Sequence, residues 1–161
     1  MSRIHNIELR SKKGYLYSDL NFALLMELEQ NITGRRHEEY VGHGIFNPIG
    51  AYHTCYHPLR QHPLSTIAPT ETDRFMRRQP IHGYVHDELA AFSGGVQGNA
   101  GLFSTADDLA KLCQMWLNGG VYGSSKVLSR NTVEKFTTSK SPNSRRGLGF
   151  DKPDMENTDK T

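Results

Sequence analysis

The sequence has few of the residues that would place it in a specialised class of protein. Only two of its 161 residues are cysteines, Cys55 and Cys113, which is too few for a disulfide framework. No run of about 18 apolar residues occurs, and residues 1–13 lack the apolar centre of a signal peptide. The sequence therefore predicts no membrane span and no targeting segment, and it leaves the compartment open.

The sequence also lacks a large excess of one charge. Its 19 Lys and Arg residues are interspersed with 17 Asp and Glu residues, which gives a formal net charge of +2. Proteins that bind nucleic acid usually carry a basic stripe or patch, whereas Arg35-Arg36 and Arg77-Arg78 are only pairs. We therefore predict no nucleic-acid partner. The length is typical of a single domain, residues 1–161.

The clearest pattern lies in residues 93–120. Four glycines close together permit positive φ angles or a close approach to another segment: Gly94, Gly95, Gly98 and Gly101. A helix is predicted to follow, capped by Ser104 with Asp107 as the acidic partner and ended by Gly119. Its apolar residues recur at helical spacing and predict a buried stripe of Ala106, Leu109, Ala110, Cys113, Trp116 and Leu117.

Three more segments have helical character. One of them is a helix that Ser18 can cap and Gly34 can end, with one face formed by Leu20, Ala23, Leu24, Leu28 and Ile32. Residues 38–46 predict a shorter helix interrupted by glycines, and Ser129 can cap a helix through Phe136. Residues 48–90 contain five of the seven prolines and predict a long irregular excursion.

The rest of the chain predicts little regular structure. Val127-Leu128 is expected to be a short extended pair, and residues 147–150 are expected to begin a strand. We expect an extended arm over residues 1–16, a helical and loop region over 17–150, and a frayed tail over 151–161.

Histidine-rich stretches offer metal ligands as an alternative. One stretch has His53, Cys55, His57 and His62; the other has His82, His86 and Asp87. These residue types suit zinc, but Pro58 and Pro63 interrupt the helix that would align the first set. We therefore predict no metal and no cofactor.

Five short motifs occur in an order that resembles a known family. They are Tyr17-Ser18-Asp19, residues 45–50 followed by Thr54, Gly83-Tyr84-Val85-His86-Asp87, residues 98–109 (GNAGLFSTADDL), and Gly147-Leu148-Gly149-Phe150. In this order they resemble the serine β-lactamase and penicillin-binding-protein-like hydrolases of the class C esterase type, which are found in bacteria. The resemblance extends over nearly the whole chain.

The resemblance implies a fold and a reaction. The fold expected is mainly α with long irregular loops, a partial α/β fold of the β-lactamase and transpeptidase type that lacks most of the central sheet. The reaction expected of the longer parent protein is hydrolysis of an ester, amide or β-lactam through an acyl-enzyme. That family uses a Ser-x-x-Lys nucleophile motif, and no Ser-x-x-Lys occurs here. The chain alone is therefore expected to be inactive.

The resemblance also assigns candidate site residues. Tyr17 matches the tyrosine that transfers protons, and Asp19 stands where asparagine is commoner, so the catalytic candidates are Tyr17 and Asp19. His86 and Asp87, as a paired imidazole and carboxylate, are candidates for substrate binding; the alternative is a hydrogen bond that fixes the loop.

Two further expectations concern partners. The alternative function is a non-catalytic binding or interaction domain on the same scaffold, attached to a glycoside hydrolase as in some relatives. Without the sheet, the apolar helix faces lack cover, so we expect self-association of the chain. The resemblance also implies that the longer parent protein is exported to the periplasm.

Overall fold

A computed structural model describes residues 17–138 and 145–153. The predicted arm over residues 1–16 and most of the predicted tail, residues 154–161, lie outside the described part. The chain forms two compact units: the first contains the chain up to Val41 together with Cys55–Phe103, and the second contains Gly42–Thr54 together with the chain from Ser104 onward. The expectation of one domain stays a prediction, and each unit is described by itself.

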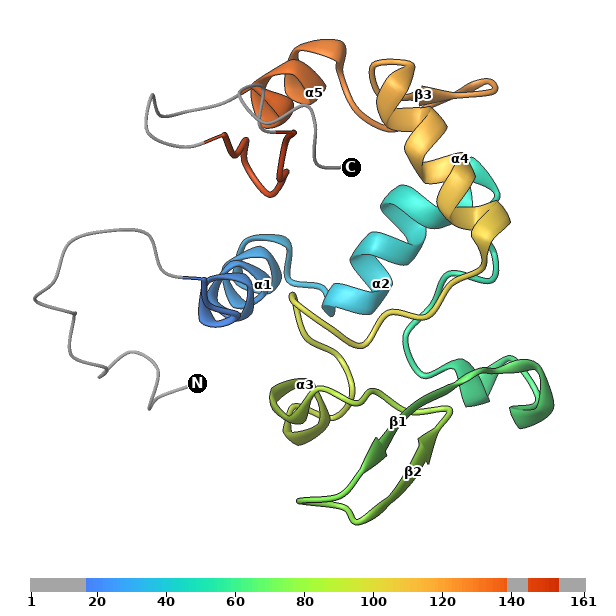
Figure 1. Cartoon of the computed structure of the whole chain (residues 1–161). Helices are drawn as coiled ribbons and strands as arrows, with labels where there is room; N and C mark the ends of the chain where they lie inside the picture. The colour runs from blue at the N-terminus through green and yellow to red at the C-terminus, as the bar shows by residue number, and fades with distance from the viewer. Residues whose placement is uncertain (1–16, 139–144, 154–161) are drawn as a thin grey trace, which may run out of the picture. The chain divides into compact units, whose positions relative to one another are not determined.

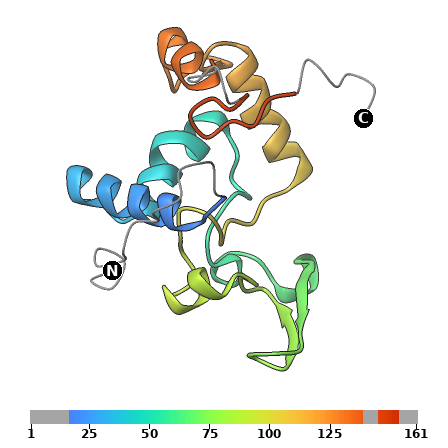
Figure 2. The same cartoon turned by 60° about the vertical axis from the view of Figure 1, so that its left-hand side comes forward.

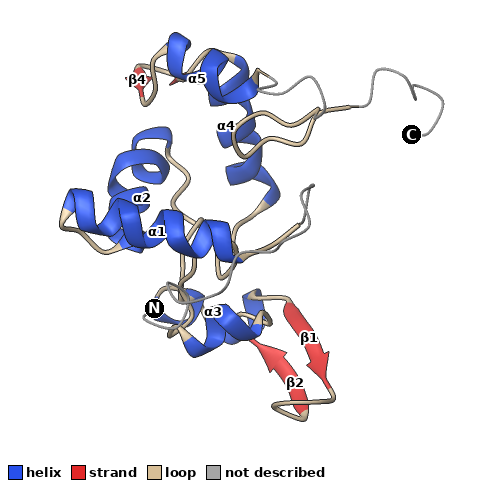
Figure 3. Ribbon diagram, turned by 90° about the vertical axis from the view of Figure 1, so that its left-hand side faces the viewer, coloured by secondary structure: helices blue, strands red, loops and turns tan. Residues whose placement is uncertain are grey.

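Helices and loops make up most of the described chain (Figure 3). The strands within this part form only two antiparallel sheets of two strands each. The prediction of a mainly helical, loop-rich fold without most of a central sheet is therefore confirmed.

Helix α1, Leu20–Thr33, opens the first unit (Figure 1). Gly34 ends it in the left-handed conformation, with φ of 66°, as predicted. Asp19 occupies the cap position, one residue after the predicted cap, and its carboxylate makes no capping hydrogen bond. The Ser18 hydroxyl nevertheless accepts a hydrogen bond of 3.3 Å from the N–H of Leu20, the first residue of the helix. Of the predicted apolar face, Ala23 is buried, whereas Leu24, Leu28 and Ile32 are exposed. Met26, which was not assigned to that face, is also buried.

Residues 48–90 are less irregular than predicted. They contain β1, Pro69–Asp73, paired antiparallel with β2, Gln79–His82, and helix α3 follows at Glu88–Phe92. Figures 1 and 2 show β1 and β2 side by side. The prolines obscured these strands, because proline argues against a central strand. Both strands of a two-stranded sheet are edge strands, where proline is tolerated.

The glycine-rich stretch lies against α1 within the first unit. A Cβ atom on Gly98 would stand 2.2 Å from the carbonyl oxygen of Phe22, so only glycine permits this approach. Gly94, Gly95 and Gly101 have positive φ, as their spacing predicted. The stretch ends in a bridge between Cys55 and Phe103, whose backbone groups exchange two hydrogen bonds of 2.9 Å.

The predicted helix over residues 38–46 is divided at its first glycine. Helix α2 covers His37–Val41, a π-helical turn covers Gly42–Phe46 and a 3₁₀ turn covers Asn47–Ile49. The second unit thus begins with two short turns, from which Phe46 and Ile49 are buried. Pro48 lies in the 3₁₀ turn, and Gly50 ends it with positive φ.

Helix α4, Ala106–Leu117, is the longest helix of the second unit. Its cap is Thr105, whose hydroxyl accepts a hydrogen bond from the N–H of Asp108, so the predicted cap at Ser104 is wrong by one residue. The buried face carries Asp108 and Met115. The predicted buried stripe is wrong: Leu109 is 46% exposed, Leu117 is 79% exposed and Cys113 is exposed.

The second unit ends with a small hairpin, a helix and a loop. Strands β3, Val121–Tyr122, and β4, Ser125–Lys126, pair with each other, and Val127-Leu128 then bonds the carbonyl of Gly120. Helix α5, Arg130–Thr137, is capped by Ser129, as predicted. Residues 147–150 do not begin a strand; they form a loop against α4 and α5 (Figure 2), held by a bond from Leu148 N–H to the Phe136 carbonyl and by Trp116–Phe150 ring contact.

Candidate functional site

Tyr17 and Asp19 lie immediately before α1 in the first unit. The Tyr17 side chain is 70% exposed, so its phenol is accessible to another molecule. Asp19 accepts the first helical hydrogen bonds of α1 through its backbone carbonyl, from the N–H groups of Phe22 and Ala23 at 3.1 Å. Its carboxylate makes no capping hydrogen bond to the helix.

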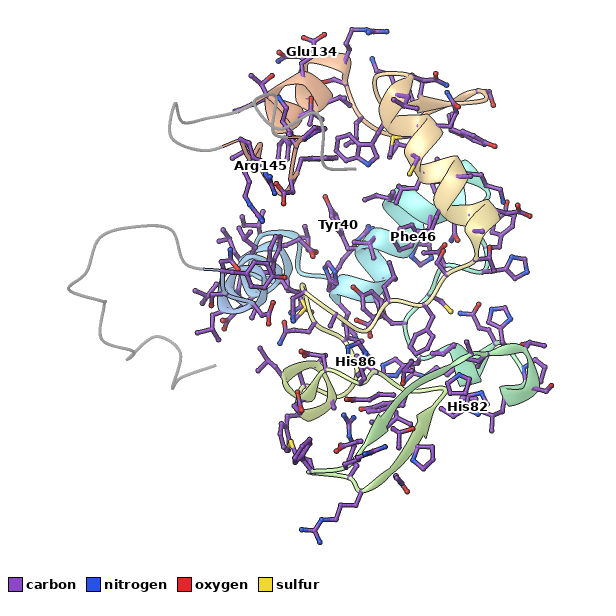
Figure 4. All side chains as sticks on the ribbon, in the orientation of Figure 1. Tyr40, Phe46, His82, His86, Glu134 and Arg145 are labelled. Atoms are coloured by element: carbon purple, nitrogen blue, oxygen red, sulfur yellow. The ribbon has the colours of Figure 1, made fainter. Side chains whose placement is uncertain are left out.

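His86 and Asp87 lie between β2 and α3, where Figure 4 labels His86. His86 is exposed. Asp87 caps α3, because its Oδ1 accepts a hydrogen bond of 2.7 Å from the N–H of Ala90. This contact is the loop-fixing role that the sequence left open for Asp87, made to α3 and not to His86.

The structure does not join the two predicted pairs directly. Within the described residues, no hydrogen bond or ion pair links Tyr17 or Asp19 to His86 or Asp87. Each pair is instead fixed by its own helix, α1 for the first and α3 for the second.

The buried carboxylate of Asp73, which Arg77 links to the backbone of His86, was not predicted from the sequence. Asp73 ends β1 and accepts four hydrogen bonds, from the N–H groups of Phe75, Met76 and Arg77 and from Nε of Arg77, all at 2.8–2.9 Å. The backbone bond from Arg77, the bond from its side chain and the other backbone bonds hold the pKa of Asp73 well below its usual range. Its ionised form therefore holds the β1–β2 turn.

A second buried carboxylate organises the second unit. Asp108 is 1% exposed and accepts bonds from the backbone N–H of His53 at 2.7 Å, from Nζ of Lys111 at 2.8 Å and from the Thr54 hydroxyl at 3.3 Å. Burial alone would raise its pKa, but these donors outweigh burial and lower it. Thr54 and Asp108 each belong to one of the family motifs, but nothing in the sequence relates the two motifs to each other.

A third titratable cluster joins α1, α2 and the chain that follows Thr54. The Nδ1 atom of His37 contacts the carboxylate of Glu29, and the ring of His37 packs edge-on against Tyr56 with centroids 5.7 Å apart. Burial, then the negative charges of Glu38 and Glu29, raise the pKa of Tyr56 to about 12. The Tyr56 hydroxyl donates to the carbonyl of the buried Gln97 at 3.4 Å.

The described residues offer no metal centre and no membrane span. Among residues 17–138 and 145–153, no three His, Cys, Asp or Glu side chains are grouped so that they could hold a metal ion. The helices in this part are too short or too polar to cross a bilayer.

Comparison with known proteins identifies related sequences along almost all of the chain. Residues 3–156 match the β-lactamase family model. A protein of Escherichia coli strain K12 and one of Escherichia coli O157:H7, each named "Putative D-alanyl-D-alanine carboxypeptidase", are 38% identical over 156 residues. A protein of the same name from Salmonella gallinarum is 36% identical. The match covers 89% of this chain but 36% of each relative, so the chain spans about a third of their length.

Solved structures agree on the fold. A penicillin-binding protein from Bacillus halodurans aligns with 84% of this chain and 39% of its own, with a TM-score of 0.55 and 18% identity. An octameric penicillin-binding protein homologue from Pyrococcus abyssi aligns with 81% of this chain and 27% of its own, with a TM-score of 0.56 and 20% identity. At these identities the likeness concerns the fold.

Proposed function

This chain belongs to the β-lactamase family, and we propose that it forms the middle part of a serine hydrolase in which Tyr17 transfers protons. The bond cleaved is an ester, an amide or a β-lactam. The name shared by the curated relatives favours the amide of a peptide that ends in D-alanine. The serine and lysine of the nucleophile motif belong to another part of the longer protein, because this sequence has no Ser-x-x-Lys.

The observation that carries the proposal is the placement of Tyr17. Its phenol is exposed, and Tyr17 lies three residues before Leu20, the first residue of α1. An oxygen in that place can accept the proton of an attacking serine hydroxyl and pass it to the nitrogen or oxygen of the leaving group.

Asp19 has a supporting role in this proposal. Its carboxylate does not cap α1, so it can accept a hydrogen bond from the lysine of the nucleophile motif. An ionised aspartate cannot donate to a substrate carbonyl as asparagine does. This difference favours a peptide or ester substrate over a β-lactam.

His86 and Asp87 provide the substrate side of the site in our proposal. The exposed imidazole of His86 can contact a substrate, whereas Oδ1 of Asp87 holds α3. Asp87 therefore fixes the backbone next to His86 and leaves only Oδ2 for a bound molecule.

A non-catalytic interaction domain is the second candidate, because the nucleophile motif does not occur in this sequence. Labelled penicillin and a fluorophosphonate separate the two when the adducts are measured by intact mass. We expect no adduct on the 161-residue chain and one adduct per molecule on the longer protein that contains it. A longer protein that forms no adduct and hydrolyses no ester or D-alanyl peptide would favour the interaction domain, and a stoichiometric adduct on this chain alone would contradict its inactivity.

A further inference from the structure

We propose that Arg77 is a positioning residue, which holds the backbone of Val85 and His86 and thereby sets the place of the proposed substrate-binding pair. This inference rests on the proposed function for its catalytic consequence. We call the contacts of Arg77 with Asp73, Val85 and His86 the clamp, and all of them lie within the first unit.

Asp73 first fixes Arg77. Its carboxylate, 5% exposed, binds the backbone N–H of Arg77 and also Nε of its guanidinium, both at 2.9 Å. One carboxylate thus holds the main chain and the side chain of the same arginine. Asp73 therefore fixes the orientation of the Arg77 guanidinium plane and balances its charge.

The outer nitrogens of Arg77 then hold two successive carbonyls. Nη1 donates to the Val85 carbonyl at 2.9 Å, and Nη2 donates to the His86 carbonyl. Because each peptide unit is planar, fixing these two oxygens fixes the planes of the peptides on both sides of His86. The direction of the His86 side chain and the position of Asp87 follow from those planes.

Hydrogen bonds on either side also hold this stretch: the Tyr84 hydroxyl donates to the Ala91 carbonyl at 3.3 Å, and Asp87 caps α3. Residues 83–87 belong to no strand or helix, and the Thr70 hydroxyl bonds the Tyr84 carbonyl at 2.9 Å, one residue before the clamp. The Val85 side chain is buried, whereas the next residue, His86, is exposed. Lysine cannot replace Arg77, because one ammonium group cannot span a carboxylate and two carbonyls in a plane.

The test compares Arg77→Lys with Arg74→Lys, since Arg74 is an exposed residue of the same turn. Hydrogen exchange of the 161-residue chain, followed by mass spectrometry, reports on each segment. We expect the peptide covering residues 83–92 to exchange about tenfold faster in Arg77→Lys, with α4 unchanged. Arg74→Lys is expected to exchange like the unaltered chain. Equal exchange in the two variants would overturn the clamp.

Kinetics of the longer protein test the positioning role. We expect Arg77→Lys to raise KM about tenfold and to change kcat less than about twofold, with Arg74→Lys unaffected. Faster exchange with unchanged KM and kcat would show a structural role only and overturn the positioning. If the unaltered longer protein hydrolyses no substrate, the proposed function fails, and the exchange experiment alone decides the clamp.

Discussion

The carboxylate of Asp108 accepts a hydrogen bond of 2.7 Å from the backbone N–H of His53, 55 residues earlier in the chain. The same carboxylate binds Lys111, whose Nζ also donates to the Gly50 carbonyl at 2.7 Å. Asp108 and Lys111 therefore tie α4 to residues 50–54 through both side chains.

Replacing Asp108 by alanine is expected to destabilise the second unit. The change removes the acceptor of the His53 N–H and of the Lys111 ammonium, whereas the Thr54 hydroxyl keeps Ser104 as a partner. Because the Lys111 side chain is partly exposed, we expect a loss of about 1–3 kcal/mol. Asp107 provides a matched control, because it is exposed and lies one residue away on α4. Urea unfolding followed by Trp116 fluorescence measures the difference. An Asp108→Ala midpoint equal to that of Asp107→Ala would contradict the account.

Acid is expected to weaken the fold through the same residue. The folded-state pKa of Asp108 is lowered, so its contribution is complete above the unfolded value of about 3.9 and is lost as the pH falls through the folded value. Asp73 acts in the same direction. We expect the unfolding free energy to fall steeply below about pH 4. In Asp108→Asn the curve should be flatter; an unchanged slope would refute this link.

Alkali provides a separate test at Tyr56. Its pKa is raised to about 12, above the ordinary tyrosine value of about 10. Between these values the unfolded chain loses the proton more easily, so stability should fall as the pH rises through that range. Ultraviolet difference titration is expected to show a late ionisation that Tyr56→Phe removes. If the late phase persists in Tyr56→Phe, it belongs to another tyrosine.

The sequence predicted the features that local chemistry decides. Ser129 caps α5 and Gly34 ends α1, because each acts on its own helix end. The glycine spacing predicted a close approach, and Gly98 makes it to Phe22. The helix at Ser104 was predicted with its cap one residue too early, since Ser104 and Thr105 are both good caps. In the structure the Ser104 hydroxyl bonds that of Thr54 instead, at 2.7 Å.

Features that depend on distant segments could not be predicted. The β1–β2 hairpin was hidden by Pro69 and Pro80, because the pattern does not reveal that both strands are edges. The α4 stripe was predicted to be buried because its spacing is helical, but burial needs a partner surface. Motif order predicts Tyr17 as a candidate, whereas the contacts of Arg77 involve two carbonyls that no spacing rule relates to it.

Tyr17 can be tested in the longer protein by Tyr17→Phe. The change removes only the hydroxyl from an exposed side chain, so the melting temperature should stay the same. A proton-transfer role predicts a loss in kcat of about 10²–10⁴. Tyr40→Phe is a suitable control, since Tyr40 is also an exposed tyrosine of the first unit. Unchanged turnover of an ester or D-alanyl peptide would leave Tyr17 without a catalytic role.

Self-association is expected of the isolated 161-residue chain. On α1, Leu28 and Ile32 are 53% and 76% exposed, and on α4, Leu117 is 79% exposed. Exposed apolar patches larger than a few hundred Å² are unusual on monomers, and two copies can cover such faces by a symmetric contact. Light scattering over a dilution series should show a concentration-dependent mass. Leu117→Ser should shift it towards the monomer, whereas Phe92→Ser, at an equally exposed position of α3, should not. A chain that stays monomeric at every concentration, with a sharp cooperative melt, would show that these faces need no cover.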